Sequence, residues 1–286
     1  MEIRVAASPR EAKYYTTKEL REDFLIQNLF VPGELKMVYS HVDRIIVGAA
    51  VPVEDIVLSG EADLKAEYFC ERRELGVLNI GGSGTITVDG KVFKVGYQEA
   101  MYIGMGSRSV VFSSDDAENP AKFYFNSAPA HHTYPTVVIK PEGEPGEDCV
   151  IVKPENNVAL GNREDANERV ICKYIVPDQV KSCQLVMGIT KLKPGSVWNS
   201  MPCHTHDRRM EVYLYIDLPE NAFVMHYMGE PQETRHIVIR NEEAVISPSW
   251  SIHAGSGTRA YSFVWGMVGE NQTFSDMDGV AMQDLL

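Results

Sequence analysis

Two histidines stand one residue apart at positions 204 and 206, and a glutamate follows at position 211. In an extended strand, side chains two residues apart point to the same face, so His204 and His206 can both reach one ion. Glu211 opens the next predicted strand, and the segment SPSWSIHAGSG offers His253 as a fourth ligand at the start of another. Imidazole nitrogens with a carboxylate suit zinc, iron, manganese, nickel or cobalt. These residue types and spacings predict a metal site.

The same alternation orders the residues beside these ligands. Cys203 is adjacent to His204, so in a strand it should point away from the ion. Tyr213 and Tyr215 share a strand face with Glu211 and should line the same pocket.

The elements that would position these residues are mainly strands. The segment TITVDGKVFKVG, residues 85–96, alternates β-branched residues around Asp89-Gly90, which predicts a two-residue hairpin. β-branched and aromatic enrichment predicts further strands at residues 122–129, 235–241 and 260–268, and helices are expected only at residues 16–30 and 277–285.

The chain divides into two β-rich parts. Residues 1–140 are predicted to form an N-terminal domain without metal ligands, and residues 178–286 a C-terminal metal-binding domain. The segment between them, residues 141–177, is rich in Pro, Gly, Asn and Glu and is interpreted as a linker.

Short internal matches indicate that the two parts arose by duplication. ERRELGVLNIGGSG, residues 71–84, resembles DRRMEVYLYIDLPE, residues 207–220, and YQEAMYIGMGSRS aligns in the same order with NEEAVISPSWSIH. In this alignment Ser109 falls opposite His253, and the first part has no histidine matching His204 or His206. Only the second copy is predicted to keep the ligands.

Composition limits the classes of partner. The chain has 286 residues, 44% hydrophobic and 23% charged, with a net charge of −13 and no clustered Lys and Arg, which argues against nucleic acid. No run of 18 apolar residues exists, the N-terminus lacks a secretory pattern, and the five cysteines are scattered singly. We expect a cytoplasmic protein that binds a small molecule and no membrane. Because the chain as a whole is negatively charged, an acidic substrate would need a local cationic pocket that offsets this repulsion.

Gly195, His204, His206 and Glu211 resemble the first cupin motif, and Pro248 with His253 resembles the second, although Trp250 stands where glycine is usual. This resemblance implies an all-β bicupin: two double-stranded β-helix (jelly-roll) barrels with few helices, one of them degenerate.

A closer resemblance runs from residue 37 to the C-terminus. MVYSHVDRIIVG, PAKFYFNSAPAHHTYPT, NSMPCHTHDRRMEVY and VISPSWSIHAGSGTRAYSFVWGMVGENQ resemble the 5-keto-4-deoxyuronate isomerases, also called 4-deoxy-L-threo-5-hexosulose-uronate ketol-isomerases. The resemblance implies one Zn²⁺ per subunit, held by His204, His206, Glu211 and His253, and a homohexamer in the cytoplasm. It also implies conversion of 5-dehydro-4-deoxy-D-glucuronate to 3-deoxy-D-glycero-2,5-hexodiulosonate during pectin breakdown. A divalent ion can stabilise the enediolate of such an aldose–ketose isomerisation.

The catalytic candidates are Glu211, Arg235 and His236. A guanidinium matches a substrate carboxylate in two parallel hydrogen bonds, and Arg235 precedes a strand of the metal-bearing part. His236 is a candidate proton carrier. The alternatives are a surface ion pair of Arg235 with Glu233 and a histidine that is only hydrogen-bonded.

Three other functions remain open from the residues alone. A cupin dioxygenase or decarboxylase uses the same ligand types with iron or manganese. A sugar-binding regulator would bind a ligand without turnover, and a related isomerase would act on another sugar acid.

Overall fold

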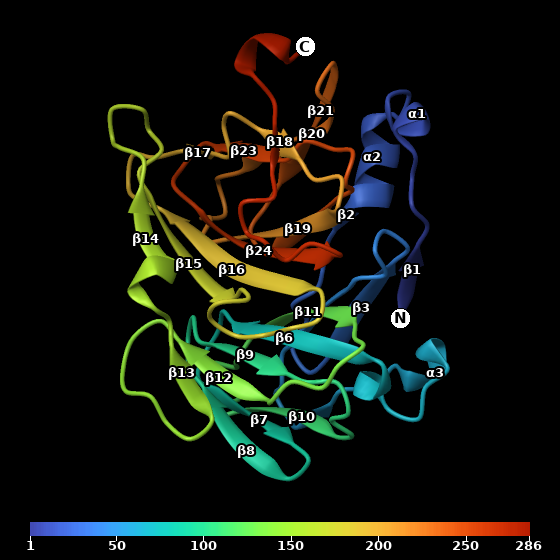
Figure 1. Cartoon of the computed structure of the whole chain (residues 1–286), viewed down its shortest axis with the longest axis vertical. Coiled ribbons are helices and arrows are strands. Elements are labelled where there is room, and N and C mark those ends of the chain that lie inside the picture. Colours follow the sequence, from blue (N-terminus) through green and yellow to red (C-terminus); the bar gives the residue numbers. More distant parts are fainter. The chain divides into compact units, whose positions relative to one another are not determined.

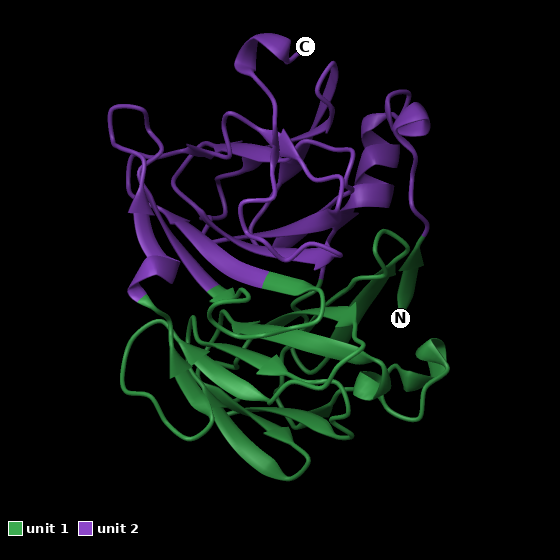
Figure 2. Cartoon of the chain, viewed as in Figure 1, with its two compact units in different colours: residues 1–4, 29–153, 174–186 green, residues 5–28, 154–173, 187–286 purple.

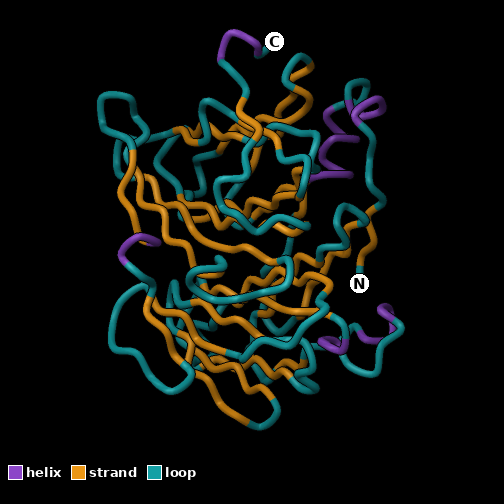
Figure 3. Tube along the Cα trace, in the orientation of Figure 1, coloured by secondary structure: helices purple, strands orange, loops and turns teal.

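A computed structural model describes residues 1–286, and strands far outweigh helices among its regular elements (Figure 3). The chain forms two compact units, coloured separately in Figure 2. Unit 1 contains residues 1–4, 29–153 and 174–186, and unit 2 contains residues 5–28, 154–173 and 187–286. This division differs from the expected boundaries, because residues 5–28 group with the C-terminal strands. No helix of the chain is long and apolar enough to cross a membrane.

Unit 1 consists of two sheets around an apolar core. The larger sheet has the order β1 (Glu2–Arg4), β3 (Leu35–Ser40), β4 (Ile46–Ala50), β11 (Phe123–Pro129), β6 (Arg73–Asn79), β9 (Ala100–Ile103), β12 (Val137–Lys140) and β13 (Cys149–Ile151). The smaller has the order β5 (Ile56–Val57), β10 (Val110–Ser114), β7 (Gly84–Val88) and β8 (Lys91–Val95). Two short helical turns, α3 (Glu61–Leu64) and η1 (Phe69–Glu71), precede β6. Buried side chains of both sheets, including Phe112, Phe123 and Phe125, pack together in its core.

Unit 2 repeats this plan (Figure 1). Its larger sheet has the order β14 (Asn157–Leu160), β15 (Arg169–Ile175), β16 (Leu185–Leu192), β24 (Ser262–Gly269), β19 (Arg209–Ile216), β22 (Glu243–Ser247) and β2 (Leu25–Ile26). The smaller has the order β17 (Trp198–Asn199), β23 (Ala254–Gly257), β20 (Val224–Glu230) and β21 (Glu233–Ile239), and β18 (His204–Thr205) pairs with β25 (Asp278–Gly279). The helical elements are α1 (Pro9–Ala12), α2 (Thr17–Phe24), η2 (Pro154–Asn156) and η3 (Met282–Asp284).

The strand orders support the duplication. The run β3-β4-β11-β6-β9 in unit 1 corresponds to β15-β16-β24-β19-β22 in unit 2, and β5-β10-β7-β8 corresponds to β17-β23-β20-β21. Ser109 directly precedes β10 as His253 precedes β23, and Leu75 is the third residue of β6 as Glu211 is of β19. Leu75 is fully buried in the apolar core of unit 1. The fold is therefore an all-β double-stranded β-helix, present twice, and unit 1 has Leu75 and Ser109 where unit 2 has the predicted ligands Glu211 and His253.

The predicted hairpin at residues 85–96 is confirmed. β7 and β8 pair with Val88 opposite Lys91, which leaves Asp89 and Gly90 as a two-residue turn. Their φ angles of 49° and 83° are both positive, as the turn that matches strand twist requires.

The two predicted helices are shorter than expected. A capping box between Thr16 and Glu19 starts α2, but the helix ends at Phe24, because Leu25 and Ile26 pair as an edge strand with β22. At residues 277–285 only the 3-10 turn η3 is helical, and Gly279 pairs with His204 instead. Sheet pairing overrides helix propensity in both places.

The segment interpreted as a linker, residues 141–177, carries three strands. β13 joins the larger sheet of unit 1, while β14 and β15 form a hairpin in which Val158 pairs with Ile171. β-branched residues pair here although the surrounding sequence is rich in turn formers, so the linker interpretation was wrong for much of this segment.

Candidate metal centre

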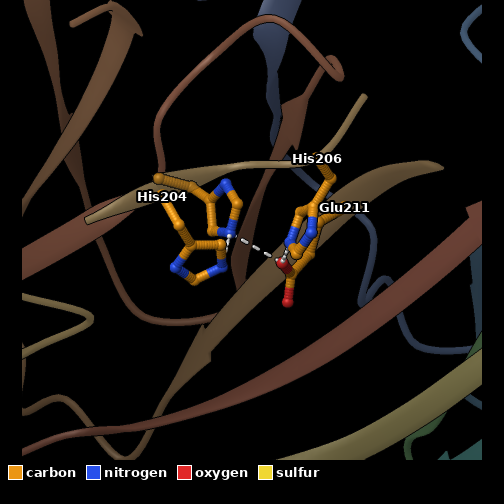
Figure 4. Close-up of side chains that lie close together, drawn as sticks. His204, His206 and Glu211 are labelled. Carbon is orange, nitrogen blue, oxygen red and sulfur yellow. Dashed lines mark hydrogen bonds and ion pairs between the residues drawn. The ribbon is translucent and has the colours of Figure 1, made fainter. Parts of the chain in front are cut away.

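Strand pairing brings the four predicted ligands together in unit 2. His204 lies in β18, which β25 holds in place, and the amide of His206 donates to the carbonyl of Ser249, 3.2 Å away. Glu211 lies in β19, and His253 directly precedes β23. Figure 4 shows the side chains of His204, His206 and Glu211 turned toward a common point. All four residues are buried.

The ligand atoms are close enough to share one ion. They all lie within 4.8 Å of one another. His204 Nε2 and His253 Nε2 are 3.0 Å apart, His206 Nε2 is 3.0 Å from Glu211 Oε2, and His253 Nε2 is 2.7 Å from the same oxygen. Ligand atoms about 3 Å apart fit around an ion with bonds of about 2 Å, which is the zinc–nitrogen length.

The hydrogen bond of His206 indicates which of its nitrogens faces this point. Its Nδ1 lies 2.6 Å from the carbonyl oxygen of Asp276, and a carbonyl can only accept, so Nδ1 carries the proton. In the neutral ring Nε2 then presents a lone pair toward the carboxylate of Glu211. Two buried acceptors in contact repel unless a cation lies between them; a proton can fill this role in the free protein, and the converging donor set can hold a metal ion there instead.

Electrostatics favours the ligating protonation states. Burial, together with the neighbouring His253, lowers the pKa of His204 to about 3, so its ring stays neutral at physiological pH. Burial alone would raise the pKa of Glu211, but His253 and His206 outweigh it and hold that pKa well below the usual value. A neutral imidazole and an ionised carboxylate are the forms that bind metal.

A cavity of about 260 Å³ opens beside this group, and its lining includes His204, Glu211 and Tyr213. Most of the remaining wall is apolar, with Met201, Phe263, Trp265, Met267, Phe274 and Met277. The Tyr213 hydroxyl lies 3.2 Å from that of Ser200, and burial raises its pKa well above the usual value, so it stays a neutral phenol. The volume suits a small ligand, and the apolar wall excludes water around it.

Arg235 and His236 do not line this cavity. The Arg235 guanidinium donates to backbone carbonyls of Ala12, Lys13 and Tyr15, and thereby ties the N-terminal segment to β21. His236 is exposed on the same strand. The three carbonyls take three of the five N–H groups of Arg235, and no ion pair joins it to Glu233. Neither Arg235 nor His236 belongs to the four-residue group or to the cavity wall, and a catalytic role for them stays a prediction.

Of the other residues singled out from the sequence, Cys203 lies as predicted and Tyr215 does not. Cys203 is fully buried in a small apolar cluster with Ile252 and Ala254, and it is not part of the metal-type group. Tyr215 was predicted to line the pocket with Tyr213, but it is absent from the cavity wall: its side chain is fully buried, and its hydroxyl lies 2.8 Å from Nδ1 of His226.

Two polar residues were missed from the sequence. His226 is fully buried, and burial followed by the effect of His253 lowers its pKa to about 3. Buried and half-buried residues alternate along β20, and His226 lies on the buried face. The period of the strand was the signal that could have indicated this. Arg169 lines the cavity from β15, in the segment interpreted as a linker.

The repeated double-stranded β-helix and the single His₃Glu group define a bicupin with a metal-type site in its second barrel. The chain belongs to the KduI/IolB family, whose model matches residues 24–282.

Relatives agree with this assignment along the whole chain. The chain is 64% identical to the 4-deoxy-L-threo-5-hexosulose-uronate ketol-isomerase of Lachnoclostridium phytofermentans and 58% identical to the enzyme of that name from Lachnospira eligens, in each case over the full length of both proteins. Among solved structures, an IolB-like protein from Salmonella typhimurium LT2 superposes with a TM-score of 0.66 at 12% identity, covering 90% of this chain and 96% of that one. The structural similarity concerns the fold alone.

Proposed function

We propose that the chain is a metal-dependent ketol-isomerase that converts 4-deoxy-L-threo-5-hexosulose uronate, an aldose, into the 2-ketose 3-deoxy-D-glycero-2,5-hexodiulosonate. The observation that carries the proposal is the buried His₃Glu group, with its lone pairs converging beside a small cavity. The identity of the substrate is inferred from full-length relatives that bear the name of this activity.

The residues of the cavity suit a proton shift between adjacent carbons. When bound, a divalent ion supplies Lewis acidity worth several kcal/mol to neighbouring substrate oxygens without a change in redox state. His204, His206, Glu211 and His253 would hold it. The neutral phenol of Tyr213 can donate a hydrogen bond to a substrate oxygen, and the apolar wall excludes water that would compete for the same groups.

The family resemblance supports further proposals. The ion is zinc, the assembly is a homohexamer, and the reaction belongs to the cytoplasmic breakdown of pectin-derived uronates. The ligand set itself accepts several divalent metals. The net charge of −13 disfavours nucleic acid as a partner, and the small cavity beside the His₃Glu group supports a small-molecule substrate.

Proton NMR of the metal-loaded protein with freshly prepared 4-deoxy-L-threo-5-hexosulose uronate in D₂O tests the reaction. We expect the aldehyde-hydrate signal of the substrate to be replaced by signals of the 2,5-diketo acid, and deuterium in the product indicates proton transfer instead of hydride shift. No conversion by fully loaded protein would overturn the proposal, and oxygen consumption with the same substrate would point to a cupin dioxygenase.

A further inference from the structure

The cavity beside the metal-type group contains a single cationic side chain. Arg169, the first residue of β15, lines the same cavity as His204 and Glu211, and no lysine or second arginine lines it. The chain as a whole carries a net charge of −13, so its overall field repels an anionic ligand. A positive group inside the cavity provides the local attraction that such a ligand needs.

The Arg169 guanidinium has unused hydrogen-bonding capacity. Its Nη1 donates to the carbonyl of Asn167 at 2.8 Å, and its Nε is buried without a partner. It forms no ion pair with an acidic side chain of the chain. Burial lowers the pKa of this group, because the charged form loses water without gaining a counter-ion. A carboxylate bound in the cavity would supply the missing counter-ion and offset the lost hydration.

The backbone fixes this arginine in place. Arg169 pairs with Leu160 in the β14–β15 hairpin, and the carbonyl of Glu168 accepts a hydrogen bond from the amide of Lys193 at 2.8 Å. Gly161 makes room for the guanidinium, since a Cβ there would lie 2.9 Å from Arg169 Nη1 and 2.3 Å from the carbonyl oxygen of Asn167. The group is therefore held on a rigid strand, as a binding residue should be.

We propose that Arg169 binds the substrate carboxylate and so selects sugar acids over neutral sugars. The inference rests on the proposed function for the identity of the substrate. In a six-carbon uronate the aldehyde and the carboxylate stand at opposite ends, so one end can lie at the His₃Glu group while the other meets Arg169. This role replaces the one predicted for Arg235, whose guanidinium is engaged by backbone carbonyls.

The test compares Arg169→Met with Arg163→Met, which removes the same charge from an exposed position of the loop before β15. Both variants should keep the wild-type metal content. We expect R169M to raise KM for the uronate by roughly tenfold to a hundredfold, the range for loss of a hydrogen-bonded charge, with a smaller change in kcat. R169K should fall between R169M and wild type, because lysine keeps the charge and loses the planar fork. Equal KM values in R169M and R163M would overturn the proposal.

A binding measurement separates this inference from the reaction. Equilibrium titration of metal-loaded protein with D-galacturonate and with D-galactose needs no turnover. We expect wild type and R163M to prefer the acid, and R169M to lose that preference. If wild type prefers the acid but converts no uronate, the proposed function fails while the role of Arg169 stands. If R169M keeps the preference, or wild type has none, Arg169 is not the carboxylate partner.

Discussion

Replacing His253 with alanine removes one of four ligands without touching the strands that carry the others. Its Nε2 lies 3.0 Å from that of His204 and 2.7 Å from Glu211 Oε2, so the loss leaves two imidazoles and one carboxylate. Losing a residue that only orients a ligand already weakens metal binding about 10–100-fold, so losing a ligand should weaken it by at least about a hundredfold.

This loss of affinity has a measurable effect on stability. A metal present at about 100 times its Kd stabilises the folded state by about 2.7 kcal/mol, and a hundredfold weaker site forfeits most of that. One kcal/mol moves Tm by roughly 2–4 °C in domains of this size, so the zinc-induced rise in Tm should shrink by roughly 5–10 °C.

The assay is thermal unfolding of wild type and H253A, each with added zinc and with chelator. His253 is only 1% exposed, so alanine also leaves a packing defect, but that defect lowers Tm in both conditions and cancels in the difference. His236→Ala is the control, because it removes an exposed histidine outside the group. If H253A kept the full zinc-induced shift, the ligand assignment would be wrong.

Three further predictions concern residues outside the ligand set. The lowered pKa of His226, about 3 against a usual 6.5, means that the unfolded chain binds an extra proton between these values. The metal-free protein should therefore lose about 1.4 kcal/mol per pH unit from this residue as pH falls below 6.5, and His226→Gln should flatten that slope in urea titrations. Arg235→Met should lower the free energy of unfolding by about 1–3 kcal/mol and expose the N-terminal segment to protease, while the intact protein keeps its turnover. Lost turnover with unchanged protease resistance would restore Arg235 as a catalytic candidate. Glu74 accepts hydrogen bonds from the Tyr102 hydroxyl and from three backbone amides at residues 183–185. Glu74→Ala should therefore destabilise unit 1 by about 3–5 kcal/mol in denaturant titrations, and Glu74→Gln by less. Equal effects of the two substitutions would contradict a role for the negative charge.

The sequence could bring together three of the four residues of the His₃Glu group because their signal is local. His204, His206 and Glu211 lie within eight residues, and the period of a strand alone predicts which of them share a face. The hairpin around Asp89-Gly90 was predictable for the same reason, since its turn type depends on two adjacent residues.

Features set by distant pairing could not be predicted in this way. Arg169 reaches the cavity because β15 is placed next to β16 in the sheet, and a turn-rich segment hides that strand. Arg235 has the sequence context of a binding residue, but carbonyls more than 200 residues away engage it. Leu25 and Ile26 continue a helical pattern and nevertheless pair with β22, because an edge strand of the sheet is available to them.

The most direct test measures metal content and turnover together as chelator removes the ion from the wild-type protein. We predict one divalent ion per chain, isomerisation of 4-deoxy-L-threo-5-hexosulose uronate that falls in proportion to the metal removed, and recovery when zinc is returned. Metal-free protein that still isomerises the substrate at the full rate would contradict the account, because the converging lone pairs of His204, His206, Glu211 and His253 would then have no part in the chemistry.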